Sequence, residues 1–240
     1  MNLITLKELI NSGVQIGNIS YKSDLKKNKF IYKIINNVCI IDLIQTSKYL
    51  LKAYIFLYKT SFYNKNLIFI DSNKINKTLI KKTAKLTKQY YITEPFVPGM
   101  FSNWKIFYNN ILLLNWVDNV IQILQNKSIF NNLNYKNKKE IQNIFNKLNY
   151  KFKNFKGIIQ IPDIIIFLDI NKNKQAFKEA KYLNKIIISI IDTDSNSDLI
   201  NLPIPGNNKN YFSIKIILEI LTTAIIHGNL KNQLLISNLN

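Results

Sequence analysis

The chain has 240 residues, 47% of them hydrophobic and 20% charged, so it can bury a core and is not of the disordered class. Its 33 basic residues, all of them lysine, face 14 acidic residues and give a net charge of +19, which indicates a polyanionic partner, either nucleic acid or an anionic membrane. One cysteine (Cys39) and one histidine (His227) exclude a disulfide framework and His-rich zinc sites, and they disfavour a His-based catalytic triad.

The first 70 residues are predicted to alternate between helix and strand. Cys39 lies in an apolar run and is expected to be a buried structural thiol. Asp42 can cap the helix that follows it, whose apolar face would carry Leu50, Leu51, Tyr54 and Leu57. The predicted elements are a helix over Leu3–Asn11, a lysine-rich loop over Tyr21–Lys33, a strand over Asn37–Ile41, a helix over Leu43–Tyr63 and a buried strand over Leu67–Ile70.

A lysine stripe marks the next helix, which begins at Ser72 or Asn73 and extends to about Lys88. At 100° per residue its lysines share one face, and the opposite face would bury Ile75, Leu79, Thr83 and Leu86. An ordinary solvated face would interleave glutamates in i,i+4 pairs, and this segment has none. The stripe therefore favours phosphate binding over simple solvation, through Lys74, Lys77, Lys81, Lys85 and Lys88.

A helical hairpin is predicted after the strand Tyr90–Ile92 and the Pro/Gly loop Glu94–Ser102. Its turn would occupy Asn126–Asn137, and its acids are Asp118 and Glu140 alone. Apolar residues keep the spacing of three and four that an antiparallel pair requires. They are Phe107, Ile111, Leu114 and Ile121 in the first helix, and Ile141, Phe145, Leu148 and Phe152 in the second.

The last third reads as strand–helix–strand–helix, typical of a parallel sheet covered on both faces. The elements are strands over Ile164–Leu168 and Ile186–Ile191 and helices over Lys172–Leu183 and Tyr211–His227. His227 would cap the last helix just before Gly228. We expect an α/β domain from residues 1–102 and 157–228, an inserted hairpin at 103–156 and a C-terminal tail at 229–240.

Enzymatic and membrane roles receive little support. The sequence has 6 glycines and lacks both G-x-G-x-x-G after a strand and a P-loop. Asp71, Asp169 and Asp192 each end a strand, so they could form a carboxylate cluster for a nucleotide- or metal-dependent α/β enzyme, or each could cap the following helix, which is the favoured interpretation. The apolar run Ile158–Leu168 is shorter than the ~18 residues of a membrane span, and no aromatic-faced amphipathic anchor accompanies the lysines.

Several motifs resemble the bacterial-type ribosomal protein S2 family. Their order and spacing agree over about 60 residues of the last third, and shorter similarities extend over the rest of the chain. In the first half, the similar segments are Gly13–Gly17 (GVQIG), Ile40–Thr46 (IIDLIQT), Ala53-Tyr54 with Phe56-Leu57, and the loop Phe96–Trp104. In the last third, they are Ile161–Asp169 (IPDIIIFLD), Lys178–Ala180 (KEA), Ile190–Thr193 (IIDT), Asp198–Ile200 (DLI), Pro203–Asn207 (PIPGN) and Ser213–Lys215 (SIK).

The resemblance implies a three-layer α/β sandwich with a mainly parallel, flavodoxin- or Rossmann-like sheet and an inserted coiled-coil hairpin. It implies a non-catalytic protein of the small ribosomal subunit that binds rRNA and neighbouring ribosomal proteins, with no cofactor, metal, membrane or small-molecule substrate. The family's two early histidines are replaced here by Gln15 and Asn18, which puts any metal site there in doubt. Its Arg-Trp pair is replaced by Pro95 and Phe96, so cationic contacts there would pass to Lys105.

The candidate RNA-binding residues lie in three places: the early loop, the stripe and the hairpin. Lysine is a point charge without the planar fork of arginine, so we expect recognition of shape and backbone rather than of base edges. The candidates are Lys22, Lys26, Lys27, Lys29, Lys74, Lys77, Lys81, Lys85, Lys88, Lys105, Lys136, Lys138 and Lys139.

The composition also indicates a compartment. Asparagine and isoleucine make up about a third of the chain, and residues with GC-rich codons are scarce. Such an AT bias, with an N-terminus that resembles neither a signal peptide nor a transit peptide, suggests a gene carried in an organelle genome, and an AT-rich bacterium fits it equally. Since plastids commonly encode proteins of the family that the chain resembles, the resemblance implies a plastid, an apicoplast or another non-green plastid, with the mitochondrion as the second choice.

Overall fold

The computed structural model describes residues 4–22, 29–126, 134–152, 155 and 158–237. The chain divides into two compact units, one formed by residues 1–96 and 162–240 and the other by residues 97–161. Each unit is built around its own apolar cluster.

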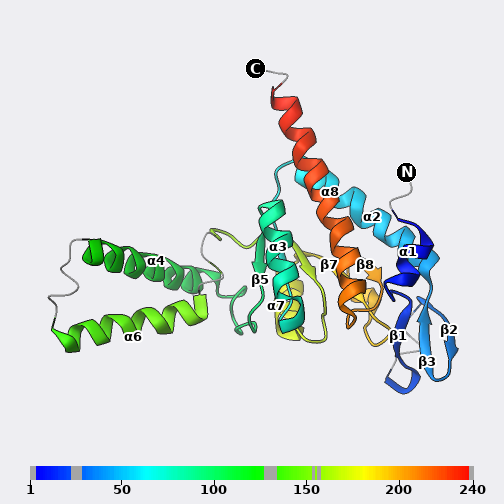
Figure 1. Ribbon diagram of the computed structural model, residues 1–240, viewed down its shortest axis with the longest axis horizontal. Helices are drawn as coiled ribbons and strands as arrows, with labels where there is room; N and C mark the ends of the chain where they lie inside the picture. The colour runs from blue at the N-terminus through cyan, green and yellow to red at the C-terminus, as the bar shows by residue number, and fades with distance from the viewer. Residues whose placement is uncertain (1–3, 23–28, 127–133, 153–154, 156–157, 238–240) are drawn as a thin grey trace. The chain divides into compact units, whose positions relative to one another are not determined.

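A five-stranded parallel sheet forms the centre of the first unit, in the strand order β5-β4-β6-β7-β8 (Figure 1). The three inner strands are short runs of Ile, Leu and Phe buried almost completely, which confirms the predicted parallel sheet. The edge strand β8 contains Pro203 and Pro205, which an edge tolerates because one side of it makes no ladder. The strands are β4 (Leu67–Ile70), β5 (Tyr90–Ile92), β6 (Ile164–Phe167), β7 (Ile186–Ile191) and β8 (Leu202–Pro205).

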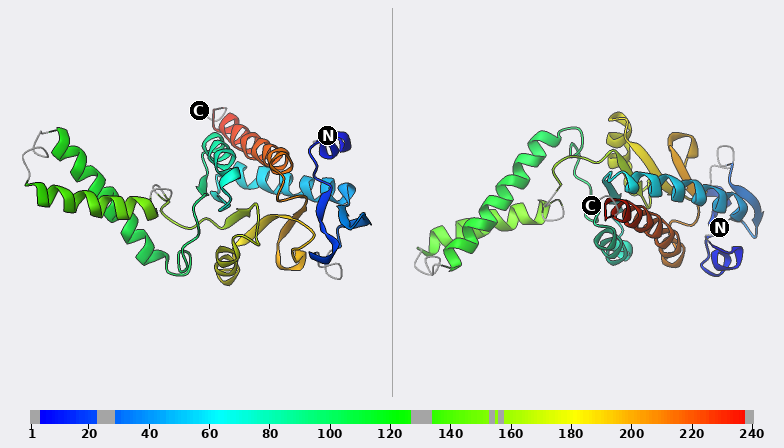
Figure 2. Two further views of the ribbon diagram at one scale, coloured as in Figure 1. Left: turned by 60° about the horizontal axis from the view of Figure 1, so that its bottom comes forward. Right: turned by 90° about the horizontal axis from the view of Figure 1, so that it is seen from above.

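Helices cover both faces of this sheet, as predicted for a three-layer α/β sandwich. The crossover from β4 to β5 and that from β6 to β7 move outward in opposite directions along the sheet. Because parallel crossovers are right-handed, their helices lie on opposite faces. Figure 2 shows α2 (Leu43–Phe62), α3 (Lys77–Thr87) and α8 (Tyr211–Ser237) on one side, and α7 (Lys174–Tyr182) on the other.

A small antiparallel sheet, in the order β1-β3-β2, precedes α2 in the chain. It consists of β1 (Ile16–Ile19), β2 (Ile31–Ile35) and β3 (Val38–Ile41), and the short helix α1 (Leu6–Asn11) comes before it. The prediction of a loop over residues 31–33 was therefore wrong. Most of β2 is exposed, so it lacks the alternation that identifies a half-buried strand. Asn36 and Asn37, both with positive φ, make the tight turn into β3.

Helix α8 does not end at His227, and the prediction of a helix end there was wrong. It continues to Ser237, because Gly228 serves a close helix–helix contact instead of a C-cap. A Cβ added at Gly228 would lie 2.8 Å from Ser61 Cβ and 3.0 Å from the backbone nitrogen of Phe62, both at the end of α2. His227 is an interior helical residue whose Nδ1 lies 2.6 Å from the hydroxyl oxygen of Tyr54.

The same helix has the length and composition of a membrane-spanning segment, although 56% of its most apolar window is buried in the fold. Its inward residues, among them Ile214, Leu218, Leu221 and Ile225, belong to the main core cluster. Burial of this kind is what the central helix of a globular domain requires, and α8 fills that position between α2 and α3.

The predicted burial holds for most of α2. Leu50, Tyr54 and Leu57 are buried as expected, and so is Cys39 in β3. Leu51 is 42% exposed, in contrast to the prediction, and the small Ala53 is buried instead, so the buried face of the helix is rotated from the predicted one.

The second unit contains α4 (Trp104–Asn126) and α6 (Tyr135–Phe152), which pack side by side as the predicted pair of helices (Figure 1). The Phe107 ring meets Phe152 and Phe155 edge-on, with centroids 4.9 and 5.2 Å apart, and Ile111 and Leu114 are buried behind it. The predicted turn over Asn126–Asn137 is too long at its second end, since α6 already begins at Tyr135; residues 127–133 lie outside the described part.

Replacing Gly228 with alanine should destabilise the first unit. A methyl group there must push α2 and α8 apart, which costs about 1–3 kcal/mol and outweighs the better helix propensity of alanine. Urea unfolding measures the change, and Lys231→Ala, an exposed substitution on the next turn, should stay within about 0.5 kcal/mol of the parent. Equal stability of Gly228→Ala and the parent would show that the contact is not tight.

Candidate nucleic-acid interface

The lysine stripe follows strand β4 and runs along the short 3-10 turn η2 (Lys74–Asn76) and helix α3. Asn73 starts the turn by accepting a hydrogen bond from the Ile75 amide at 3.3 Å. Lys74, Lys85 and Lys88 are exposed, and Lys81 is half-buried. The structure thus brings these lysines to one outward face, which is called the α3 lysine face below.

The opposite side of α3 packs differently from the prediction. Leu79 and Thr83 are buried as expected, but Ile75 is 63% and Leu86 57% exposed. The buried side is centred on Ile80, Ala84 and Thr87, whose compact side chains let α3 approach α8 and the sheet. Ile75 and Leu86 therefore lie along the margin of the buried side, where they are solvent-accessible.

Lys77 differs from the other members of the stripe, because it forms an ion pair with Glu94 from the loop after β5. Both side chains are about one-third exposed, so the pair is partly shielded from solvent. The helix itself has no acid, and the pair could not be expected from the sequence because Glu94 lies 17 residues away. The α3 lysine face accordingly consists of Lys74, Lys81, Lys85 and Lys88.

The early-loop lysines are described only in part. Lys22 lies in the 3-10 turn η1 (Ser20–Lys22), and Lys26 and Lys27 lie outside the described residues. Lys29 is exposed and pairs with Asp198 at 3.2 Å. Since an exposed pair of this kind contributes little energy, Lys29 can exchange Asp198 for a phosphate at small cost.

The hairpin lysines lie in the second unit. Lys105 is exposed in the first turn of α4, Lys136 and Lys139 are exposed on α6, and Lys138 is half-buried. The neighbouring Trp104 donates from Nε1 to the carbonyl of Ile159 at 3.1 Å. This bond anchors the start of α4, and with it the position of Lys105 within the unit.

Three lysines on α7 were not among the candidates predicted from the sequence. Lys174, Lys178 and Lys181 follow one another at intervals of four and three residues, a spacing that would have revealed them. They border a hollow of about 680 Å³ with the exposed Tyr182 and with Leu199 of the 3-10 turn η4 (Ser197–Leu199). These lysines lie on the face of the sheet opposite to the α3 lysine face.

The three strand-end aspartates make local hydrogen bonds. Asp71 accepts from the Asn73 amide at 3.1 Å and from the Asn76 side chain at 2.7 Å. Asp169 accepts from the backbone nitrogens of Asn171 and Lys172 at 2.9 and 3.3 Å, and Asp192 accepts from that of Thr193 at 2.6 Å.

These bonds stabilise the loops that leave the sheet, but they are not helix caps. The N-cap residues of η2, α7 and η4 are Asn73, Asn173 and Asn196, so the favoured capping interpretation was wrong. Within the described residues no group of three or more His, Cys, Asp or Glu side chains could hold a metal ion. The carboxylate cluster needed by the alternative enzyme is therefore not assembled in this part of the chain.

Burial dominates the electrostatics of these aspartates. It raises the pKa of Asp71, against the hydrogen bonds that lower it. It also raises the pKa of Asp169, where the charge of Asp71 adds to the effect, and it raises the pKa of Asp192 to about 6. Each carboxylate thus costs folding free energy when it is ionised.

Gln15 and Asn18 make hydrogen bonds to other residues of the first unit. Gln15 donates from its side chain to the carbonyl of Ile10 at 3.3 Å. Asn18 is 8% exposed; its backbone nitrogen donates to Thr193 at 2.9 Å, and its side-chain oxygen accepts from Lys209. These contacts tie β1 to the loops after β7 and β8.

Comparison with known proteins gives a consistent result. A model of the family described as "Ribosomal protein S2" matches residues 9–228. The small ribosomal subunit protein uS2c of Toxoplasma gondii is 34% identical over 235 residues, which cover 97% of this chain and all of the relative. That of Phaeodactylum tricornutum is 31% identical over 95% of this chain and 99% of its own. The small ribosomal subunit protein uS2 of Microcystis aeruginosa is 28% identical over 97% and 86%.

Asp192→Asn should stabilise the protein at neutral pH. Because the pKa of Asp192 is higher in the folded state than the ordinary value near 3.9, the folded chain binds more protons between about pH 4 and 6, and its stability falls as the pH rises through this window. Removing the charge should add about 3 kcal/mol at pH 7 and nothing at pH 3. Urea unfolding at the two pH values tests this, with the exposed Asp198→Asn as the control.

Proposed function

This chain belongs to the ribosomal protein S2 family, and we propose that it binds small-subunit rRNA and neighbouring ribosomal proteins in a plastid ribosome. Membership makes it a structural, non-enzymatic protein of the small ribosomal subunit. The finer proposal concerns which molecules it touches, with which side chains, and in which organelle.

The α3 lysine face is the observation that carries the rRNA proposal. Its four cations lie on one side of a helix segment that contains no acidic residue between Lys74 and Lys88. Mutual repulsion among unpaired lysines is unfavourable in the free protein and is relieved by a polyanion. The phosphates of an RNA backbone provide a dense row of negative charges that can neutralise such a face.

The type of cation indicates how the RNA is held. The chain has no arginine, so it lacks the bidentate fork that contacts guanine and phosphate in a fixed geometry. Lysines on a helix surface make point-charge contacts to phosphate oxygens, which position a protein without reading sequence. We therefore assign the α3 lysine face to the sugar–phosphate backbone of folded rRNA.

The plastid assignment is supported by the relatives. The proteins from Phaeodactylum tricornutum, Toxoplasma gondii and Trieres chinensis all carry the plastid-type name uS2c. The AT-biased composition agrees with an organelle genome, and the relative from Toxoplasma gondii favours a non-green plastid such as an apicoplast.

Sedimentation of a native lysate through a magnesium-containing gradient tests the function. We expect this chain to migrate with small-subunit rRNA and to be released at high salt, since phosphate contacts weaken as salt rises. Organelle fractionation of the same cells should place it with plastid rRNA. Migration as a free protein of 28.1 kDa would contradict the proposal.

Lys81→Glu with Lys85→Glu should weaken rRNA binding without unfolding the domain. Lys77 is not mutated, because a glutamate at that position would face Glu94 and repel it. Lys81 and Lys85 take no part in the Lys77–Glu94 ion pair, so the double variant leaves that pair intact. For every phosphate that the variant no longer neutralises, the slope of log affinity against log salt should become shallower by roughly 0.7–0.9.

The matched control is Lys48→Glu with Lys52→Glu, two exposed lysines four residues apart on α2, which makes the same change of net charge away from every candidate residue. Filter binding over a salt series measures both pairs. Equal losses in the two double variants would show that net charge, and not the α3 lysine face, decides the affinity.

A further inference from the structure

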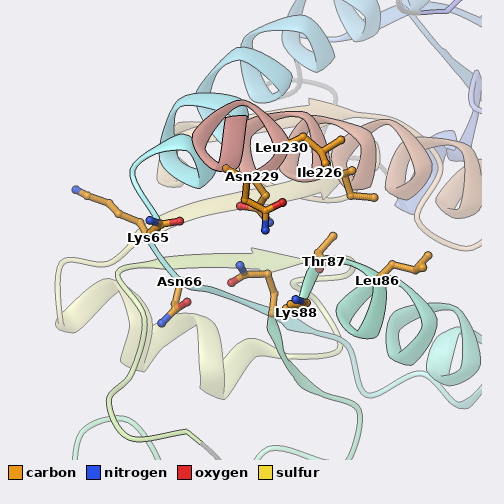
Figure 3. A pocket seen from close by; sticks show the side chains of 11 residues that line it. Lys65, Asn66, Leu86, Thr87, Lys88, Ile226, Asn229 and Leu230 are labelled. Carbon is orange, nitrogen blue, oxygen red and sulfur yellow. The ribbon is translucent and has the colours of Figure 1, made fainter. Parts of the chain in front are cut away.

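A hollow of about 380 Å³ opens at the edge of the sheet where β4 and β5 begin. Figure 3 shows it between the end of α3, the segment that follows α2, and the second half of α8. All of these elements belong to the first unit. Its volume falls within the range of small-molecule sites and exceeds what a single nucleobase needs.

Apolar side chains make one wall of the hollow. Leu86 of α3 and Leu230 of α8 are 57% and 50% exposed, and Ile226 lies half-buried beside them. Large apolar groups exposed together are unfavourable in water unless a flat or apolar partner covers them. The face of an unstacked base is such a partner, and proteins that take up extruded bases hold them between apolar or aromatic side chains.

Amide side chains make the rest of the lining. Asn66 precedes β4, and Asn229 and Gln233 project from successive turns of α8. Gln89 precedes β5, but its side-chain oxygen already accepts from the Leu67 amide at 2.8 Å, so it offers a ligand only its amide nitrogen. Asn229 faces Asn66 and Lys88 across the hollow (Figure 3). A carboxamide presents a donor and an acceptor together, which matches the edge of a nucleobase that is not paired.

The charge around the hollow is positive. Lys65 and Lys88 line it, and none of its 11 lining residues, all described, is acidic. The nearby Asp163, whose pKa is lowered by Lys185 and also by Lys65, is already held by Lys185 at 2.7 Å. A phosphate on either side of a bound base would therefore meet a cation.

Lys88 joins the hollow to the α3 lysine face, because it belongs to both. It ends α3 in the left-handed conformation, with φ of 55°, where a glycine or asparagine is the usual residue. The corresponding positions after α2 and α7 are Asn64 and Asn184. A lysine at this position costs conformational energy and places a cation where the face meets the hollow.

We propose that this hollow binds an unpaired nucleotide of RNA, its base against Leu86, Ile226 and Leu230 and its phosphates near Lys65 and Lys88. The inference rests on the proposed function and deepens it, since the α3 lysine face would hold the backbone of the same RNA. Asn229, Leu230 and Gln233 lie beyond residue 228, where the match to the family model ends, whereas Leu86 and Ile226 lie within it.

The test compares single-stranded RNA hexanucleotides of each base with an RNA duplex that has the same number of phosphates. Fluorescence anisotropy at fixed salt gives the affinities of the full chain. The variant is Asn229→Ala with Gln233→Ala, which suits a helix and removes two amides from the hollow. The matched control is Asn119→Ala with Gln122→Ala, two exposed amides on α4.

We expect the parent to prefer one base among the hexanucleotides. The α8 variant should lose roughly tenfold in affinity for that hexanucleotide and lose the base preference, with less than a twofold change for the duplex. The α4 control should change neither, and urea unfolding should show equal stability of all three proteins.

Three results would overturn the inference. An unchanged affinity and base preference in the α8 variant would show that the hollow does not hold a base. Equal losses for hexanucleotide and duplex would reduce it to a general electrostatic effect. If the α8 variant keeps its RNA affinity but small subunits assembled with it lack one neighbouring ribosomal protein, the hollow is a protein-docking site. If the parent binds neither RNA, the proposed function itself fails.

Discussion

Helices α2 and α8 meet at Gly228 with no side chain between them, and much of the first unit depends on this contact. It places α8 against the sheet between α2 and α3, where its inner residues complete the main core. It also lets α8 continue in a straight line past His227, so that Asn229 and Gln233 reach the edge of the sheet. Without a close approach at this position, the helix that forms the wall of the hollow would be displaced from its floor.

The distribution of charge follows from the same architecture. The strands themselves are apolar, and three buried aspartates lie at their ends. These aspartates accept hydrogen bonds from the loops, and their burial raises the pKa of each carboxyl group. The lysines of α3 and α7, in contrast, lie mostly on the outer surfaces of these helices, where water and counterions reach them. The chain has 14 acidic residues against 33 lysines, and Glu94 is held by Lys77, so the surface of the described residues keeps an excess of positive charge.

The sequence sufficed for features that depend on local pattern. Buried strands were recognised as unbroken apolar runs, and the lysine stripe as a helical repeat, because both periods are properties of the backbone. Features that depend on residues far away in the chain could not be predicted. The sequence indicated a helix end at Gly228, because the close contact with α2 is visible only in the structure. The exposure of Leu51 and Leu86 depends on how each helix is rotated against its neighbours. The hollow was invisible to pattern analysis, since its walls come from three segments far apart in the chain. The proposed RNA contacts remain predictions.

Lysines also lie on α7, across the sheet from the α3 lysine face. A rigid body with cations on two opposite sides is geometrically bivalent. Under the proposed function, an RNA bound to the α3 lysine face would raise the effective concentration of its own remote segments at α7. Two weak, salt-sensitive contacts would then join strands that are far apart in the RNA sequence, with the sheet between them.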